Sequence, residues 1–221
     1  MQPQETVHDA SRGRLSRRRF LTQVGIGAGG TILACAGLAE VATYAPPVSY
    51  PESEGGAAAA KRVLVAYATA RGSTGEVAQA IARTLAGRGF SVDLHPVTRP
   101  IELGGYAAVL VGSAIRAAHW LPEAVKFVQD HRDALSRIPT SYFTVCMTLA
   151  KDTEENRQRA SAFLDPVRQI LAPAKEGWFG GKYDPSACAL WERLAVSSRH
   201  MPAGDFRDWN AIKSWAGEVL S

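Results

Sequence analysis

The run from Thr69 to Thr74 concentrates hydroxyl groups and a glycine directly after an apolar segment, residues 63–68. The side chains of Thr69, Ser73 and Thr74 can each donate a hydrogen bond to an anion, and Gly72 lets the backbone turn sharply. A helix that begins here would add the partial positive charge of its N-terminus. The spacing Thr-x-x-Gly-x-Thr therefore predicts a phosphate site, formed by Thr69, Ala70, Arg71, Gly72, Ser73 and Thr74.

The same loop allows a second interpretation, an ordinary strand-to-helix turn. In that case Thr74 caps the helix by accepting hydrogen bonds from its first N–H groups. The loop itself contains neither Gly-x-x-x-x-Gly-Lys nor Gly-x-Gly-x-x-Gly, so it is neither a Walker A loop nor a dinucleotide fingerprint. The three cysteines form no Cys-x-x-Cys pair and no His/Cys cluster with metal spacing, and we predict no metal site.

Alternating apolar and amphipathic segments must position this loop. We predict strands at 62–67, 90–95, 107–112, 141–147 and 177–181, and helices at 74–86, 122–135, 154–171 and 209–220. The third strand is apolar without alternation, which indicates burial on both faces. Because strands and helices follow one another in turn, we expect one α/β domain over 61–221, with a parallel sheet between two helical layers.

Parallel sheets bind ligands beyond the carboxyl ends of their strands, so two further loops should meet the phosphate loop. The loop after the third strand offers a group of candidates, namely Ser113, Ala114, Ile115, Arg116, His119 and Trp120. Arg116 would hold negative charge or lie on the surface as a solvated arginine, and His119 is a weak candidate for a base. Trp120 would stack on a flat ring system or anchor the next helix in the core. The loop after the fourth strand offers Thr148, Leu149 and Ala150.

The phosphate loop and the strand pattern together resemble flavodoxins. The resemblance implies a five-stranded parallel sheet of order 2-1-3-4-5. It also implies FMN, with its phosphate in the first loop and its ring between the other two. Gly112-Ser113-Ala114-Ile115-Arg116 and Gly180-Gly181-Lys182-Tyr183 are similar to the protoporphyrinogen dehydrogenase branch of this family. In that branch FMN takes hydride equivalents from a porphyrinogen and passes electrons to menaquinone.

That branch also carries an insertion before its last helix, and residues 185–208 occupy this place here. The resemblance implies that Tyr183, Trp191, Arg193 and Arg199 cover the flavin and meet a carboxylate-bearing substrate or a quinone. The other interpretation is a surface hairpin packed on the sheet edge. A different class of function also stays open, an exported flavodoxin-like electron-transfer protein without a substrate of its own.

The N-terminal segment is basic and then apolar. Residues 16–21, Ser-Arg-Arg-Arg-Phe-Leu, match the twin-arginine export motif, and a Gly- and Ala-rich apolar stretch follows from 24 to 39. This layout predicts export, with the domain held at the outer face of a membrane. Three fates of residues 1–45 stay open: lipidation of Cys35 in a lipobox-like sequence, cleavage by an ordinary signal peptidase, or retention of 20–45 as an anchor.

Residues 46–60 are rich in Pro, Gly and Ala, and we expect a flexible linker there. The formal net charge of +4 comes largely from the first 34 residues, which hold five arginines and two acidic residues. The remainder is close to neutral, so the domain carries no electrostatic signature of nucleic-acid binding. The expected partners are a quinone or another respiratory component, a porphyrinogen, and the membrane through the N-terminus.

Overall fold

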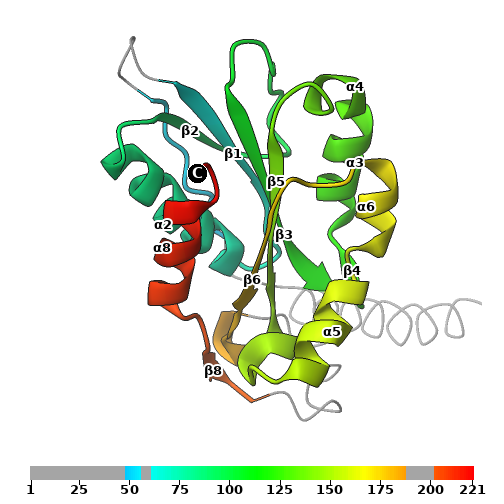
Figure 1. Ribbon diagram of the computed structural model, residues 1–221. Coiled ribbons are helices and arrows are strands. Elements are labelled where there is room, and N and C mark those ends of the chain that lie inside the picture. The colour runs from blue at the N-terminus through cyan, green and yellow to red at the C-terminus, as the bar shows by residue number, and fades with distance from the viewer. Residues whose placement is uncertain (1–47, 56–60, 188–201) are drawn as a thin grey trace, which may run out of the picture. The chain divides into compact units, whose positions relative to one another are not determined.

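The computed structural model describes residues 48–55, 61–187 and 202–221 (Figure 1). Five parallel strands form its centre, in the spatial order β2 (Ser91–Pro96), β1 (Arg62–Ala68), β3 (Ala108–Arg116), β5 (Thr140–Cys146) and β6 (Glu176–Gly180). The neighbouring pairs are all parallel. Counted along the chain, these are the first to fifth parallel strands, so the predicted order 2-1-3-4-5 is confirmed.

Helices cover both faces of the sheet (Figure 1). On one face α2 (Ser73–Gly87) and α8 (Trp209–Glu218) pack against Val63, Val65 and Tyr67 of β1. On the other face α3 (Pro122–Asp130), α4 (Arg132–Leu135) and α6 (Asp165–Ile170) pack against the intervening residues of the same strand. Successive side chains of a strand point to opposite faces, so an apolar strand supplies two cores.

Two predicted helices are each divided. The helix expected at 122–135 is α3 followed by α4, and His131 between them leaves the helical region with φ −107°. The helix expected at 154–171 is α5 (Glu154–Ala162) followed by α6. Pro166 lies in the first turn of α6, where its missing N–H is tolerated, whereas inside one continuous helix it would remove a hydrogen bond.

The loop predicted after the third strand is a β-hairpin. Strand β3 continues to Arg116, and the chain turns at Ala117 and Ala118, with φ of 50° and 66°, into β4 (His119–Trp120). A two-residue turn with both φ values positive matches the twist of the flanking strands. Such turns usually carry Asn or Gly, so the alanine pair gives no turn signal in the sequence.

Residues 48–55, called the strap below, differ from the flexible linker predicted at 46–60. Ser53 and Leu94 exchange two backbone hydrogen bonds of 3.1 and 2.7 Å, which add the strap antiparallel to β2. The physical reason is that β2 is an edge strand, whose outer backbone groups need partners. The expectations for residues 1–45, including Cys35, lie outside the described residues.

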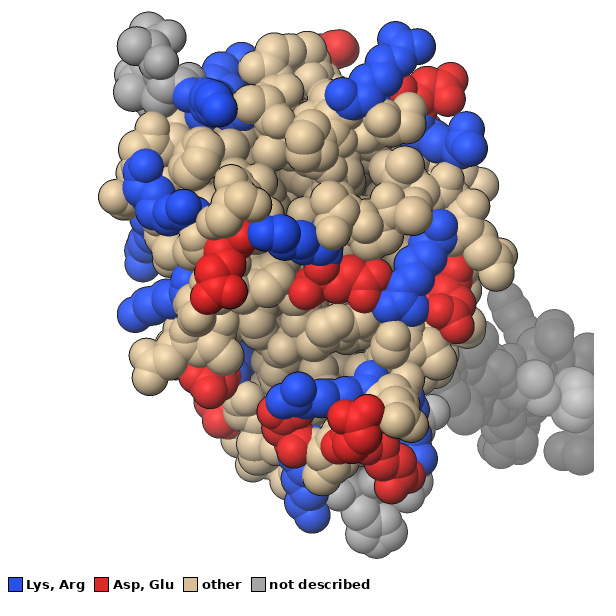
Figure 2. Space-filling model, viewed as in Figure 1, with Lys and Arg blue, Asp and Glu red and all other residues tan. Residues whose placement is uncertain are grey.

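Charges of both signs are interspersed on the face of the molecule drawn in Figure 2. Ion pairs of the described residues include Arg168 with Glu176 at 2.6 Å and Arg157 with Asp152 at 2.5 Å. Such mixed charge gives no extended patch of one sign on this face. In the part of the chain that the structure describes, no helix has the length and hydropathy needed to span a bilayer.

Candidate cofactor site

The predicted phosphate loop lies between the end of β1 and the start of α2. Gly72 occupies the N-cap of α2 in the left-handed region, with φ 87°, and its N–H donates to the Thr69 hydroxyl oxygen over 3.0 Å. This bond closes a tight turn, which explains why a threonine and a glycine stand three residues apart. The N-cap makes no side-chain hydrogen bond, so the amino end of a 15-residue helix is left without a side-chain cap.

The hydroxyl group of Thr74 gives the main indication of a ligand at this loop. The residue is 0% exposed, and its hydroxyl has no hydrogen-bond partner. Thr74 is the second residue of α2 and makes no capping hydrogen bond, so the cap that the alternative interpretation assigned to it is not formed. An unmade hydrogen bond of a buried hydroxyl costs about 1–3 kcal/mol. An acceptor seated at the helix amino end would remove that cost, and the donor set of this loop therefore fits a phosphate.

The hairpin β3–β4 stands beside this loop, because Ala68 at the end of β1 is in register with Ser113 of β3. Ser113 is fully buried, accepts a hydrogen bond from Leu121 N–H over 3.0 Å and donates to the Ala114 carbonyl over 2.8 Å. Its hydroxyl thus holds the hairpin closed and is not turned toward a ligand. Ala114 and Ile115 are half-buried farther along the strand.

Trp120 anchors the chain in the core and is not placed to stack on a ligand ring. It is 3% exposed, its indole N–H donates to the Thr144 hydroxyl over 2.9 Å, and its ring meets the Tyr142 ring at 5.0 Å. This anchor keeps Trp120 in the core, so it is withdrawn from the candidate cofactor contacts. Arg116 and His119, by contrast, are exposed and paired across the hairpin, which brings the two candidate catalytic residues together at its tip.

The third loop is the short helix η1 (Met147–Ala150), which contains all three residues predicted there. Leu149 is buried in a small cluster with Cys146 and Ala160, and Ile115 of the hairpin packs against the same cluster. Thr148 and Ala150 are half-buried at the rim. The second and third loops are therefore in contact through Ile115 and this cluster. Burial raises the pKa of the Cys146 thiol, which makes it a packing residue and not a nucleophile.

Sequence reasoning missed a clamp on the phosphate-loop helix. The guanidinium of Arg207 donates to Glu76, in the first turn of α2, over 2.8 Å, and to both oxygens of Asp205. Its side chain is only 3% exposed and lies 4.5 Å over the Trp209 ring. Arg207 thereby offsets a negative charge in the first turn of α2, next to the candidate anion site. No local signal could have identified the pair, because the partners are 131 residues apart in sequence.

The clamp belongs to the base of the predicted insertion. Strands β7 (Lys182–Tyr183) and β8 (Gly204–Asp205) pair antiparallel, directly after β6. A Cβ on Gly180 would lie 2.2 Å from the Phe206 carbonyl oxygen, so only glycine allows this approach. The short helix η2 (Pro185–Ala187) follows β7, whereas Trp191, Arg193 and Arg199 lie outside the described residues. The insertion therefore starts and ends at the same edge of the sheet as the phosphate loop.

Two cavities lie near these elements. One of about 770 Å³ lies between β2, the strap and the loop 99–107. The other, of about 660 Å³, lies along β6 between α5 and α8, and Leu149, Ala150 and Gly180 at the carboxyl edge of the sheet are among the residues that line it. Within residues 48–55, 61–187 and 202–221, no group of three or more His, Cys, Asp or Glu side chains is placed to hold a metal ion.

The sequence of this chain is similar to sequences of known proteins. A protoporphyrinogen IX dehydrogenase [quinone] from Leishmania major is 25% identical over 176 residues, covering 72% of this chain and 75% of the relative. The protein of the same name from Escherichia coli K12 is 26% identical over 182 residues, covering 72% and 94%.

Solved flavodoxin structures are similar at lower identity. Oxidised flavodoxin 1 from Bacillus cereus is 14% identical, with a TM-score of 0.47, over 72% of this chain and 97% of its own. An archaeal flavodoxin is 16% identical, with a TM-score of 0.41, over 72% and 99%. Residues 64–208 match the flavodoxin domain family, a span that contains the three loops and the β7–β8 hairpin. On this match the chain belongs to the flavodoxin domain family.

Proposed function

We propose that this protein is an FMN-dependent oxidoreductase similar in activity to protoporphyrinogen IX dehydrogenase. The observation that carries the proposal is the buried, unpartnered hydroxyl of Thr74 at the uncapped amino end of α2. A flavin phosphate is the acceptor that family membership supplies for this position. Two curated relatives named protoporphyrinogen IX dehydrogenase [quinone] support the more specific activity.

In this proposal the first loop binds the phosphate of FMN, and the other two loops flank its ring. The hydroxyls of Thr69, Ser73 and Thr74, with the first N–H groups of α2, would bind the phosphate. The hairpin residues Ala114 and Ile115 and the η1 residues Thr148 and Ala150 would flank the ring. FMN, when bound, supplies a centre that accepts hydride and releases electrons. In this arrangement the protein contributes position and electrostatics more than acid–base chemistry.

Arg116 is the residue we assign to the substrate side. It ends β3 at the tip of the exposed hairpin, across from His119. A guanidinium there would attract the carboxylates of a porphyrinogen, or hold negative charge next to the ring. Over one turnover the substrate would lose two electrons and two protons, and a quinone would take up the same number to become a quinol. We further propose that residues 1–45 direct export and hold the domain at the outer face of a membrane.

The test uses the full chain, purified in detergent. We expect a yellow protein with one FMN per chain, reduced by protoporphyrinogen IX without oxygen and reoxidised by a menaquinone analogue. A protein that takes up no FMN would overturn the whole proposal. An FMN-loaded protein that porphyrinogen cannot reduce, but that exchanges electrons with a redox protein, would overturn the enzyme assignment and favour the electron-transfer alternative.

A further inference from the structure

The strap lies outside the part of the chain that matches the flavodoxin domain family, which begins at residue 64. It is therefore an addition to the family domain, and its contacts need a reason of their own. One end of the strap is fixed at the middle of β2 through the backbone pair of Ser53 and Leu94. The other end extends to the carboxyl edge of the sheet, where the phosphate loop lies.

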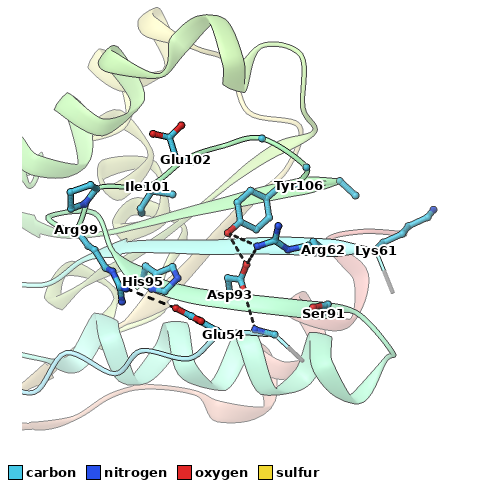
Figure 3. A pocket seen from close by; sticks show the side chains of 15 residues that line it. Glu54, Lys61, Arg62, Ser91, Asp93, His95, Arg99, Ile101, Glu102 and Tyr106 are labelled. Atoms are coloured by element: carbon cyan, nitrogen blue, oxygen red, sulfur yellow. Dashed lines mark hydrogen bonds and ion pairs between the residues drawn. The ribbon is translucent and has the colours of Figure 1, made fainter. Parts of the chain in front are cut away.

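A buried carboxylate holds the first of these ends (Figure 3). Asp93 is 3% exposed, and its side chain accepts hydrogen bonds from Gly55 N–H, Arg62 and Tyr106 over 2.6, 2.6 and 2.7 Å. Figure 3 shows Arg62 and Tyr106 pointing at Asp93 from β1 and from the loop before β3. Burial alone would raise the pKa of Asp93, but these hydrogen bonds hold it below its ordinary value. Asp93 with its three hydrogen-bond donors is called the latch below. Its carboxylate is thus charged at neutral pH.

The other end of the strap packs against the phosphate loop and α2. A Cβ built on Gly72, the N-cap residue, would lie 3.5 Å from the side chain of Val48. A Cβ on Gly75 would lie 3.1 Å from Pro51, and the Tyr67 hydroxyl donates to the Pro51 carbonyl over 3.0 Å. The strap therefore contacts the outer side of the loop at its left-handed residue and at the first turn of the helix.

We propose that the strap is a positioning element of the phosphate site, which keeps the loop 69–74 in its binding conformation. The ligand class, a phosphate ester such as FMN, rests on the proposed function. The physical argument is preorganisation: a loop already held in the binding geometry loses less conformational entropy when an anion arrives. None of the strap contacts described here involves a candidate phosphate-binding hydroxyl, so the strap acts through the loop.

Gly55 offers a way to displace the strap far from the site. A Cβ at this position would lie 2.3 Å from the Ser91 hydroxyl and 2.6 Å from the Val92 backbone nitrogen, so Gly55→Ala must push the strap away from β2. Gly104→Ala is the matched control, because a Cβ there meets nothing within 4 Å. Tyr106→Phe weakens the latch more gently, since it removes one of the three hydrogen bonds to Asp93.

The experiment compares these variants as full chains, by amide hydrogen exchange without FMN and by FMN titration. In Gly55→Ala we expect exchange of the amides of 69–76 to rise about tenfold and the Kd for FMN to rise about tenfold. Tyr106→Phe should move both quantities the same way by a smaller factor, and Gly104→Ala neither.

Loss of protection at Ser53 and Leu94 reports release of the strap. If their exchange rises while that of 69–76 and the FMN affinity stay as in the wild type, the positioning role is overturned. If Gly55→Ala does not fold, Tyr106→Phe decides by the same comparison. A wild-type chain that binds no FMN would overturn the proposed function, but the exchange measurement on the ligand-free protein would still decide whether the strap orders the loop.

Discussion

At the residue scale, Thr74 separates the stability of the ligand-free protein from its affinity for the cofactor. The Thr74→Val change removes a buried hydroxyl that has no partner. We expect it to stabilise the ligand-free protein by about 1 kcal/mol and to weaken FMN binding about tenfold. Denaturant unfolding and fluorescence titration measure the two effects. The control is Thr84→Val in the same helix, whose hydroxyl donates to the Ala80 carbonyl over 2.9 Å. Unchanged FMN affinity in Thr74→Val would mean that this hydroxyl does not contact the phosphate.

The Arg207–Glu76 pair makes a second prediction at this scale. Replacing Arg207 with Leu leaves the Glu76 carboxylate in the first turn of α2 without its 2.8 Å partner. That charge would repel a phosphate dianion, so the Kd for FMN should rise about tenfold, whereas riboflavin, which lacks the phosphate, should bind nearly as before.

The double variant Arg207→Leu/Glu76→Gln should recover part of the FMN affinity, because it removes the Glu76 charge in the first turn of α2, whereas Asp205, the other partner of Arg207, stays without its guanidinium. Equal losses for FMN and riboflavin, without recovery in the double variant, would assign Arg207 to the packing of the β7–β8 hairpin alone. Titration of both ligands with the three proteins decides between these outcomes.

At the scale of elements, the sequence predicts best where local chemistry and packing agree. The strand 62–67, the turn 69–72 and helix α2 were predicted correctly because an apolar run, a Thr/Gly turn and a helical periodicity follow one another, whereas phosphate binding by this turn stays a prediction. The hairpin at Ala117 and Ala118 could not be predicted, since alanine rarely adopts positive φ. The strap was missed for a different reason: the Pro-, Gly- and Ala-rich composition of residues 46–60 indicates a linker, and the groups on β2 that bind the strap lie about forty residues away in the sequence.

The latch of the strap predicts a pH dependence. The pKa of Asp93 is lowered in the folded protein from its ordinary value of 3.8. A lowered carboxyl pKa contributes stability that is present above 3.8 and is lost as the pH falls through the folded-state value. We therefore expect Asp93→Asn to destabilise the protein by about 2 kcal/mol at pH 7, and this difference should shrink below about pH 4. Denaturant unfolding of both proteins across pH 3–7 measures it. A difference that does not depend on pH would mean that the Asp93 charge does not matter.

At the scale of the whole molecule, the strap determines where the N-terminal arm joins the domain. Val48, the first described residue, lies next to Gly72 at the carboxyl edge of the sheet. The arm that we propose to be exported and membrane-held is thus attached beside the phosphate loop, at the same edge as the hairpin β3–β4 and the base of the insertion.

The export proposal makes its own prediction. Changing Arg17 and Arg18 together to Lys keeps the net charge but removes the arginine pair that defines the twin-arginine motif. We expect the variant to accumulate in the cytoplasm, whereas the Arg12→Lys/Arg14→Lys control, with the same number of changes upstream of the motif, is exported normally. Cell fractionation with antibody detection measures both. Unchanged export of the Arg17/Arg18 variant would indicate a general secretory signal in place of the twin-arginine motif.

The way in which the arm is held to the membrane depends on Cys35, and the three fates give different results in one experiment. If residues 32–35 act as a lipobox, Cys35→Ala should abolish incorporation of a radiolabelled fatty acid and release the protein from the membrane or leave it unprocessed. If residues 20–45 are retained as an anchor, the same change should alter neither the mass nor the membrane fraction. Ordinary cleavage would give a shortened, unlipidated chain in the wild type. A wild-type chain that carries no lipid and is found free of membranes would contradict the proposed tethering, because the N-terminal arm would then not hold the domain at a membrane.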